Sequence, residues 1–424
     1  MAELKPLLVE IGTEELPPRA LDDLAAAFAK GICEGLTKRG IGADVANAET
    51  YNSPRRLAVI VPNVAAMQPA QKSEVLGPYL NIGLGADGKP TTALLGFAAK
   101  NGVAIEQLQR TTDAKGERFV ARSERPGQAT AALMQEIIAE ALKALPIPKP
   151  MRWGDHDFAF VRPVHWLVIL HGSDVIDAEI FGIKSGRESR GHRFMHPQAV
   201  AIADANAYVD ALRAAKVLVN PVEREETISK QLGMRFRNVV GTIDVSVHID
   251  SDNLAEVRNL VEWPARIECA FDREYLSVPK EALIQTMQKN QRFFPVLDSS
   301  HKLTEHFIGI ANIESKDPSE IRKGYERVIR PRFADAKFFY DEDLKTPLAA
   351  YQDALKSVTY QQQLGSVWDK CVRVAELSRV IANRCDVDAA LATRAASLSK
   401  CDLMTRMVGE FPELQGVMGR YYAA

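Results

Sequence analysis

The 424-residue sequence predicts an α+β protein that ends in an all-α region. Three observations support this fold class. Apolar residues near the N-terminus alternate as in a strand, strand and helix patterns then mix along the chain, and only helical patterns follow Asp317. A chain of this length suits two to four domains, and we expect an α+β region over 1–145, a second α+β region over 146–315 and a helical domain over 316–424.

The first region begins with a predicted β-α-β-β unit. Residues 7–11 alternate as in a strand with one packed face. Apolar residues at helical spacing predict a helix over 21–36, which Gly40 ends. Strands are expected over 48–51 and 57–61, where β-branched and aromatic residues gather.

A mixed segment completes the first region. The patterns predict helices over 91–100 and 128–145 and a hairpin over 109–124. The prolines of ALPIPKP, residues 144–150, disfavour helix and central strand, so this stretch is the predicted linker.

The second region alternates strand and helix patterns. We expect strands at VHWLVILHG, DAEIFGI and FIGIANIE, which are residues 164–172, 177–183 and 307–314. Helices are expected at AYVDALRAAKV and NPVEREETISKQL, residues 207–217 and 220–232.

The last region begins with a helix start signal at Asp317-Pro318-Ser319-Glu320, which offers an N-cap, a proline at the first helical position and a carboxylate. Pro331 is expected to kink or interrupt this helix. A helical pattern is still under way at GRYYAA, residues 419–424, so we expect the natural protein to be longer.

Bulk composition limits the possible functions. With 53 Lys and Arg against 55 Asp and Glu, any nucleic-acid surface must be a local basic patch. No signal peptide or membrane span is expected, because the short apolar runs are interrupted by charges. The cysteines are odd in number, scattered and never spaced C-x-x-C, which predicts a reduced cytoplasmic protein; they are Cys33, Cys269, Cys371, Cys385 and Cys401.

Several motifs suggest chemistry that their surroundings argue against. Residues 83–88 match G-x-G-x-x-G, but no strand precedes them and Pro90 follows, so we interpret them as a glycine loop. Residues 155–157, Asp-His-Asp, predict a polar turn. Glu14 and Glu15 are interpreted as carboxylates near a helix N-terminus that Pro17 and Pro18 help to start, not as an acid and base pair.

Two basic clusters are candidate phosphate contacts. The first lies in RGHRFMHP and its approach, where only Glu188 opposes the cations Arg187, Arg190, His192 and Arg193. The alternatives are a solvated loop, or a zinc site on His192 and His196 that lacks further ligands. The second cluster is a stripe on the helix after Asp317, with the alternative of a solvated helix face; it consists of Arg322, Lys323, Arg327, Arg330 and Arg332.

Residues 365–382 and 394–405 resemble the helical layout of the HD phosphohydrolase domain. That chemistry needs histidines on two helices and an aspartate to hold a metal. No histidine lies beyond His306, and the HD position reads Ser399-Lys400 or Lys400-Cys401. The sequence therefore predicts an HD-like fold without its metal centre.

The longer motifs together resemble one family, the β subunit of bacterial heterotetrameric glycyl-tRNA synthetase. They fall in order from residue 7 to residue 422 and are LLVEIGTEELPPRAL, NSPRRLAVIV, MRW with FVRPVHWLVIL, RGHRF, LVEWP, RVIRPRFADAKFFYDED and DLMTRMVGEFPELQGVMGRYYA. The resemblance covers essentially the whole chain.

This resemblance implies a role without aminoacylation chemistry in the chain itself. In that family a separate α subunit carries the class II active site with ATP and Mg, and β binds and orients tRNA-Gly within an α2β2 assembly. The family fold includes a module similar to B3/B4, a degenerate HD domain and, further on, an anticodon-binding domain. We infer no editing activity from the shared module.

No catalytic residue, metal site or cofactor is expected in this chain. The resemblance places cations in family motifs as candidate contacts to tRNA or to the α subunit, with buried salt bridges as the rival explanation, strongest for Arg162 and Arg332. The candidates are Arg55, Arg56, Arg152, Arg190, His192 and Arg193, with Lys323, Arg327 and Arg330 of the basic stripe. Alternative functions are a structural scaffold for α and a metal-dependent phosphohydrolase.

Overall fold

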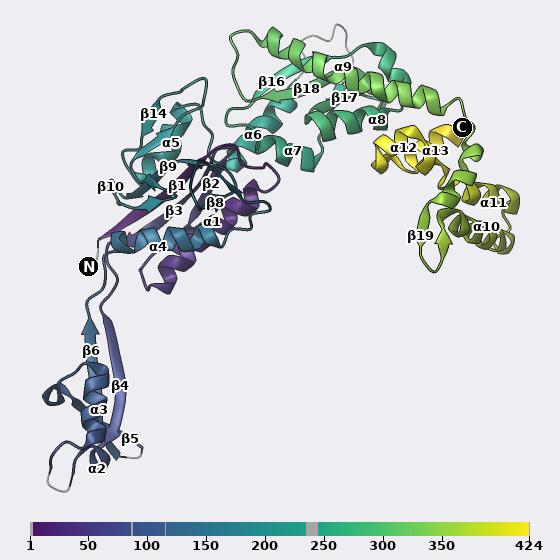
Figure 1. The fold of residues 1–424 in the computed structure, drawn as a ribbon. Coiled ribbons are helices and arrows are strands. Elements are labelled where there is room, and N and C mark those ends of the chain that lie inside the picture. Colours follow the sequence, from purple (N-terminus) through teal and green to yellow (C-terminus); the bar gives the residue numbers. More distant parts are fainter. Residues whose placement is uncertain (1–2, 86–87, 115, 235–244, 424) are drawn as a thin grey trace. The chain divides into compact units, whose positions relative to one another are not determined.

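The computed structural model describes residues 3–85, 88–114, 116–234 and 245–423. It divides into two compact units, Met1–Asn220 and Pro221–Ala424 (Figure 1). The predicted boundaries after residues 145 and 315 both fall inside these units. The three-domain division therefore stays a prediction.

A five-stranded antiparallel sheet, ordered β10-β9-β1-β3-β2, organises unit 1. Val9 of the central strand β1 lies opposite Val59 on one side and Ile169 on the other. The expected strands are confirmed, and the strand after the predicted linker joins the same sheet as the N-terminal strand. The strands are β1 (Leu4–Thr13), β2 (Glu49–Ser53), β3 (Arg56–Ala65), β9 (Val164–His171) and β10 (Asp174–Val175).

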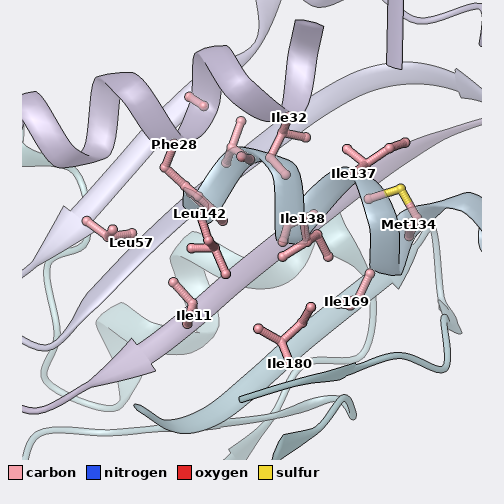
Figure 2. Packing of buried hydrophobic residues seen from close by; sticks show 14 of the residues in the cluster. Ile11, Phe28, Ile32, Leu57, Met134, Ile137, Ile138, Leu142, Ile169 and Ile180 are labelled. Carbon is pink, nitrogen blue, oxygen red and sulfur yellow. The ribbon is translucent and has the colours of Figure 1, made fainter. Parts of the chain in front are cut away.

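Two helices that are distant in sequence cover one face of this sheet, α1 (Leu21–Lys38) and α4 (Thr130–Lys143). Figure 2 shows side chains of both helices packed over the strands. They include Phe28 and Ile32 from α1 and Ile137 from α4, all fully buried. The predicted amphipathic helices are confirmed, since their apolar stripes form this core.

The opposite face of the sheet is also buried. Leu8, Trp166 and Leu170 pack there against Tyr208 and Leu212, which belong to α5 (Tyr208–Ala214). The expectation of one packed face on β1 was wrong, because β1 is a central strand and the fold supplies cover on both sides.

A separate three-stranded antiparallel sheet, ordered β4-β6-β5, contains the predicted hairpin. Its elements are β4 (Gln71–Tyr79), α2 (Leu80–Gly83), α3 (Thr92–Asn101), β5 (Gln109–Asp113) and β6 (Gly116–Arg125). Strand β4 was not among the expected elements. Gly83 ends α2 with its Cα facing Phe119, so the glycine run does not join a strand to a helix; residues 86–87 lie outside the described part.

Short elements complete unit 1. The predicted strand over 177–183 is a tight hairpin whose turn residues, Phe181 and Gly182, have φ of 52° and 74°. The remaining elements are η1 (Val45–Asn47), η2 (Ile105–Gln107), β7 (Met151–Arg152), β8 (Ala159–Phe160), β11 (Glu179–Ile180), β12 (Ile183–Lys184), β13 (Glu188–Arg190), β14 (Ala199–Ala201) and η3 (Ala205–Ala207).

Unit 2 is built on a four-stranded antiparallel sheet, ordered β15-β17-β18-β16. The long helix α9 packs on one face through Ile329 and Phe333, and Ile228 and Val257 of two other helices pack with Phe294. These elements are α6 (Pro221–Leu232), β15 (Val245–Val247), α7 (Ser251–Arg258), β16 (Ala265–Ala270), β17 (Phe294–Asp298), β18 (Leu303–Ala311) and α9 (Pro318–Asp343).

The predicted start of α9 is confirmed, since the Asp317 side chain accepts the N–H of Ser319. Helix α9 continues through Pro331 to Asp343, so the expected interruption was wrong, and the alternative of a kink at Pro331 stays a prediction. The rest of unit 2 is mostly helical but includes a two-stranded hairpin, so the region after 316 is not purely α. The elements after α9 are η6 (Leu348–Tyr351), η7 (Asp353–Ser357), β19 (Thr359–Gln361), β20 (Gly365–Ser366), α10 (Val367–Arg384), α11 (Ala389–Leu398), η8 (Cys401–Met404), α12 (Arg406–Glu410), η9 (Pro412–Leu414) and α13 (Val417–Ala423). Three further elements lie between β16 and β17: η4 (Arg273–Ser277), α8 (Lys280–Gln285) and the π-helix η5 (Thr286–Asn290).

Two buried carboxylates fix the last helices. Asp343 accepts the N–H groups of Arg406 and Met407, each at 2.9 Å. Asp402 accepts the N–H groups of Gly416 and, at 3.0 Å, Gly419. Both carboxylates therefore satisfy backbone donors at helix starts.

Candidate functional site

A turn over residues 190–196 brings together five of the predicted contact residues with the N-terminal sheet. It follows β13, and His192 lies at its centre with its side chain buried. The Nδ1 atom of His192 accepts the N–H groups of Phe194 and Met195, each at 3.2 Å. Its carbonyl oxygen accepts the N–H of His196 at 2.9 Å. His192 thus shapes the turn, because one side chain satisfies two turn donors.

Two buried arginines fix the backbone of this turn by hydrogen bonds to its carbonyl groups. Arg55 donates from Nη2 to the carbonyl oxygen of Gly191 at 2.8 Å, and Arg56 donates from Nη2 to that of Arg190 at 2.9 Å. A guanidinium group has a rigid, planar set of donors, so it fixes the position of the carbonyls that it binds.

The charge of Arg56 is balanced inside the core. Its side chain is fully buried, and Nη1 lies 3.2 Å from Oε1 of the fully buried Glu10. Glu10 also accepts hydrogen bonds from Trp166 at 3.0 Å and Ser189 at 2.7 Å. A buried ion pair is tolerated when further hydrogen bonds stabilise it, and here two more donors converge on Oε1 of Glu10.

The turn presents cations and one aromatic ring to solvent. Arg190 and Arg193 are exposed, and Phe194 is 73% exposed. Phe194 was missed by the sequence reasoning, although an aromatic residue inside the basic run RGHRF is a recognisable signal. Cations beside an exposed aromatic ring can contact phosphates and stack on unpaired bases.

Glu14 sets the position of Arg193. Nη2 of Arg193 lies 3.0 Å from both carboxylate oxygens, and Nε2 of His165 lies 3.4 Å from Oε1. Partial burial raises the pKa of Glu14, but the hydrogen bond and charge of Arg193, helped by His165, outweigh it and leave that pKa below its ordinary value. The interpretation of Glu14 as a helix-dipole carboxylate was wrong, because α1 begins at Leu21 and its first turn carries other acids, Asp22 and Asp23.

The remaining candidates of unit 1, Arg152 and Arg162, make other contacts. Arg152 is exposed, with Nη1 3.8 Å from a carboxylate oxygen of Asp157. The Asp155–Asp157 stretch is an exposed turn in which the His156 ring stacks on Phe158 at 4.5 Å, as a polar turn predicts. Arg162 donates to the carbonyl of Val161 rather than to a carboxylate within the described ranges.

The basic stripe of α9 lies on an exposed helix face, but part of its charge is neutralised. Lys323 pairs with Glu320 at 2.7 Å and Arg330 pairs with Asp272 at 3.3 Å. Arg327 is exposed and has no hydrogen bond or ion pair to the residues that the structure describes. Arg322 instead turns inward and donates to the carbonyl of Glu268 at 2.8 Å.

Three of the predicted contact residues, Arg55, Arg56 and His192, are buried in this structure. Arg55, Arg56 and His192 point their polar atoms at the backbone of the turn, so they position it. Direct contact by these three to RNA or a partner stays a prediction, and within the turn Arg190 and Arg193 are the candidates that solvent reaches. The zinc alternative is not supported by this geometry, because backbone donors occupy Nδ1 of His192, and no group of three potential metal ligands occurs in the part of the chain that the structure describes.

No helix among the described residues is long and apolar enough to span a membrane.

Comparison with known proteins defines the class of this chain. Similar proteins are named as subunits of an amino-acid–tRNA ligase. A curated relative from Xanthomonas campestris pv. campestris (strain B100), "Glycine--tRNA ligase beta subunit", is 57% identical over 423 residues, which are 100% of this chain and 60% of the relative. Relatives of the same name from Xylella fastidiosa (strain 9a5c) and Pseudomonas fluorescens (strain Pf0-1) are 55% and 48% identical, covering 100% and 98% of this chain and 58% and 59% of the relatives.

The family model described as "Glycyl-tRNA synthetase beta subunit" matches residues 7–424. The chain belongs to the family of glycyl-tRNA synthetase beta subunits. It spans about 60% of the length of the curated relatives that it matches.

Proposed function

We propose that this chain binds tRNA as a non-aminoacylating part of the glycine–tRNA ligase β subunit. It orients tRNA-Gly for the class II active site of a separate α subunit, which binds ATP and Mg. The two kinds of subunit form an α2β2 assembly in the cytoplasm. Family membership supports the subunit role. No step of aminoacylation chemistry is assigned to the residues of this chain.

The turn over 190–196 is the observation that carries the proposal of RNA contact. Its carbonyls are held by buried guanidinium groups, and it presents Arg190, Arg193 and Phe194 outward. A contact group that is already fixed loses little conformational entropy on binding, so it favours affinity. The two cations suit phosphates, and the exposed ring suits an unpaired base.

Filter binding with tRNA-Gly tests the proposal. We expect affinity to fall steeply with salt, and Arg193→Glu to reduce both the affinity and the salt slope, the slope by about one for each phosphate that the variant no longer binds. Lys184→Glu is the matched control, since Lys184 is an exposed cation of the same unit outside the turn. No tRNA binding at low salt, with the α subunit supplied, would defeat direct binding by this chain.

A structural scaffold for the α subunit is the second candidate function. Large aliphatic side chains are exposed on α10, which is typical of a protein interface; they include Val374, Leu377 and Ile381. Replacing both Arg327 and Arg330 with Glu distinguishes tRNA binding at the basic stripe of α9 from a purely structural scaffold role. Unchanged charging by the complete enzyme would leave the basic stripe as a solvated face and favour the scaffold.

The metal-dependent phosphohydrolase is the weakest candidate. It requires a metal ion bound near residues 360–405. Metal analysis of the purified chain, with hydrolysis of phosphate esters as a second measurement, decides it. Stoichiometric metal in that region would revive the hypothesis.

A further inference from the structure

A pocket of about 490 Å³ lies within unit 2, at the meeting point of four segments. Its walls come from the end of η4 and the start of α8, the turn between β17 and β18 with the first residue of β18, the C-terminal part of α9, and α13. The residues that matter to its chemistry are Leu276, Lys280, Lys302, Leu303, Tyr340 and Tyr421. Its size lies in the range of pockets that hold small molecules or single nucleotides.

Two lysines give the pocket positive charge. Lys280 donates from Nζ to the carbonyl oxygen of His301 at 2.8 Å, and Lys302 is exposed without a carboxylate partner among the residues described. The turn that carries Lys302 is well fixed, because Oδ1 of Asp298 accepts the N–H groups of Ser300 and Lys302, each at 2.9 Å. Both ammonium groups are thus available to an anion.

Two tyrosines give the pocket flat aromatic surface in fixed positions. Tyr340 stacks on Tyr422 with ring centroids 5.9 Å apart. Tyr421 donates from its hydroxyl to Glu281 at 2.8 Å, and Arg420 both covers its ring at 4.9 Å and pairs with Glu281 at 3.1 Å. Burial raises the pKa of Tyr340 and of Tyr421, so both rings carry no negative charge at neutral pH.

We propose that this pocket holds one unpaired nucleotide of a bound RNA, with its phosphate at Lys280 and Lys302 and its base against the tyrosines. This combination of cations and aromatic rings is the chemistry that binds single-stranded nucleic acid without strong sequence preference. The described residues that line the pocket include no carboxylate, which disfavours a metal ion, and the lysines disfavour a purely apolar ligand. The inference rests on the proposed tRNA-binding function.

Fluorescence anisotropy with a labelled, short single-stranded oligoribonucleotide tests the site on the full chain. We expect Lys302→Glu to weaken binding about threefold to tenfold, because it removes a cation that binds phosphate. Tyr421→Leu is expected to weaken it about tenfold, and Tyr421→Phe to weaken it clearly less, because the ring that stacks is kept and only the hydrogen bond to Glu281 is lost. Lys316→Glu is the matched control, an exposed lysine of the same unit outside the pocket.

Competition separates the possible sources of the ligand. If the site is built for RNA, excess AMP and inorganic phosphate displace the oligoribonucleotide only weakly. AMP that competes as well as the oligoribonucleotide would overturn the assignment to RNA, and equal binding by wild type and Lys302→Glu would overturn the site itself.

Measurements with tRNA-Gly keep this inference distinct from the proposed function. Reduced tRNA affinity in Arg193→Glu together with unchanged affinity in Lys302→Glu and Tyr421→Leu would refute the pocket alone. Absence of tRNA binding in the wild type would refute the proposed function, while oligoribonucleotide binding that depends on Lys302 would still support a nucleotide pocket. Circular dichroism of each variant excludes unfolding as the cause, and Lys302→Glu alters only an exposed turn residue.

Discussion

The turn over 190–196 and the basic stripe of α9 both place cations where RNA could reach them, but they are built differently. The turn rests on buried Arg55, Arg56 and His192, which bind its backbone. The stripe stands on a regular helix, where Lys323 and Arg330 pair with surface acids and Arg327 is exposed to solvent. Arg322 of the stripe instead turns inward, to the carbonyl of Glu268. Clustered basic residues in a sequence can therefore be either the support of a surface or the surface itself.

This difference predicts unequal effects of mutation, and the largest concerns Arg56. Replacing Arg56 with Met leaves Glu10 buried without its counter-charge and frees the carbonyl of Arg190. Removing one partner of a buried ion pair costs about 3–5 kcal/mol of folding free energy. Urea unfolding of the variant measures this cost.

The double variant Arg56→Met with Glu10→Met serves as the control. Removing both charges avoids the unpaired carboxylate, so the double variant is expected to be much more stable than the single variant. A single variant as stable as wild type would show that the ion pair does not support the turn.

The next effect concerns His192, which shapes the turn through hydrogen bonds to its backbone. His192→Ala leaves two turn N–H groups without their acceptor, which costs about 1–3 kcal/mol. Affinity for tRNA-Gly is expected to fall as well, because Arg193 and Phe194 lose their fixed positions. Thermal unfolding and filter binding measure the two effects.

His192→Asn is the conservative variant, since its side-chain oxygen can accept from the turn. It is expected to restore part of both properties. If alanine and asparagine behave alike, the hydrogen bonds of Nδ1 are not what holds the turn.

A smaller effect, with a pH dependence, concerns Glu14. The pKa of Glu14 is lowered in the folded chain. The ionised carboxylate therefore stabilises the fold fully at pH values above its ordinary pKa of 4.5, and this stabilisation is lost as the pH falls through the lower pKa of the folded state. The pair is close to half exposed, so the contribution is no more than about 1 kcal/mol.

Urea midpoints of wild type and Glu14→Gln between pH 6 and pH 3 measure this contribution. We expect the wild type to be more stable at pH 6 and the difference to shrink toward pH 3. A difference that stays constant over this range would assign the effect to the shape of the side chain instead of its charge.

The smallest effect on stability concerns the stripe on α9. Arg327→Ala removes an exposed side chain that pairs with no acid among the described residues, so stability is expected to change by less than about 0.5 kcal/mol. If the stripe binds phosphates, tRNA affinity nevertheless falls, and its salt slope decreases by about one. Urea unfolding and salt-dependent filter binding measure the two effects, and destabilisation comparable to that of Arg56→Met would erase the contrast between the two regions.

The sequence by itself determined the local elements and the family. Residues 7–11, the helix ended by Gly40 and the start of α9 at Asp317 have their expected forms, because caps, spacing and alternation act within a few residues. The ordered motifs identified the family that the comparisons then showed. Phe194 was within reach of the same reasoning, since it stands in a basic run.

Only the tertiary structure decided which cations are surface and which are support. Arg56 of β3 pairs with Glu10 of the adjacent strand β1, and it donates to the carbonyl of Arg190, which lies 134 positions away in the sequence. In the same way, the second cover on β1 comes from α5, some 200 residues further on, and Glu14 finds Arg193 at a separation of 179. Composition and periodicity report the neighbours of a residue along the chain, whereas burial and charge pairing depend on neighbours in space.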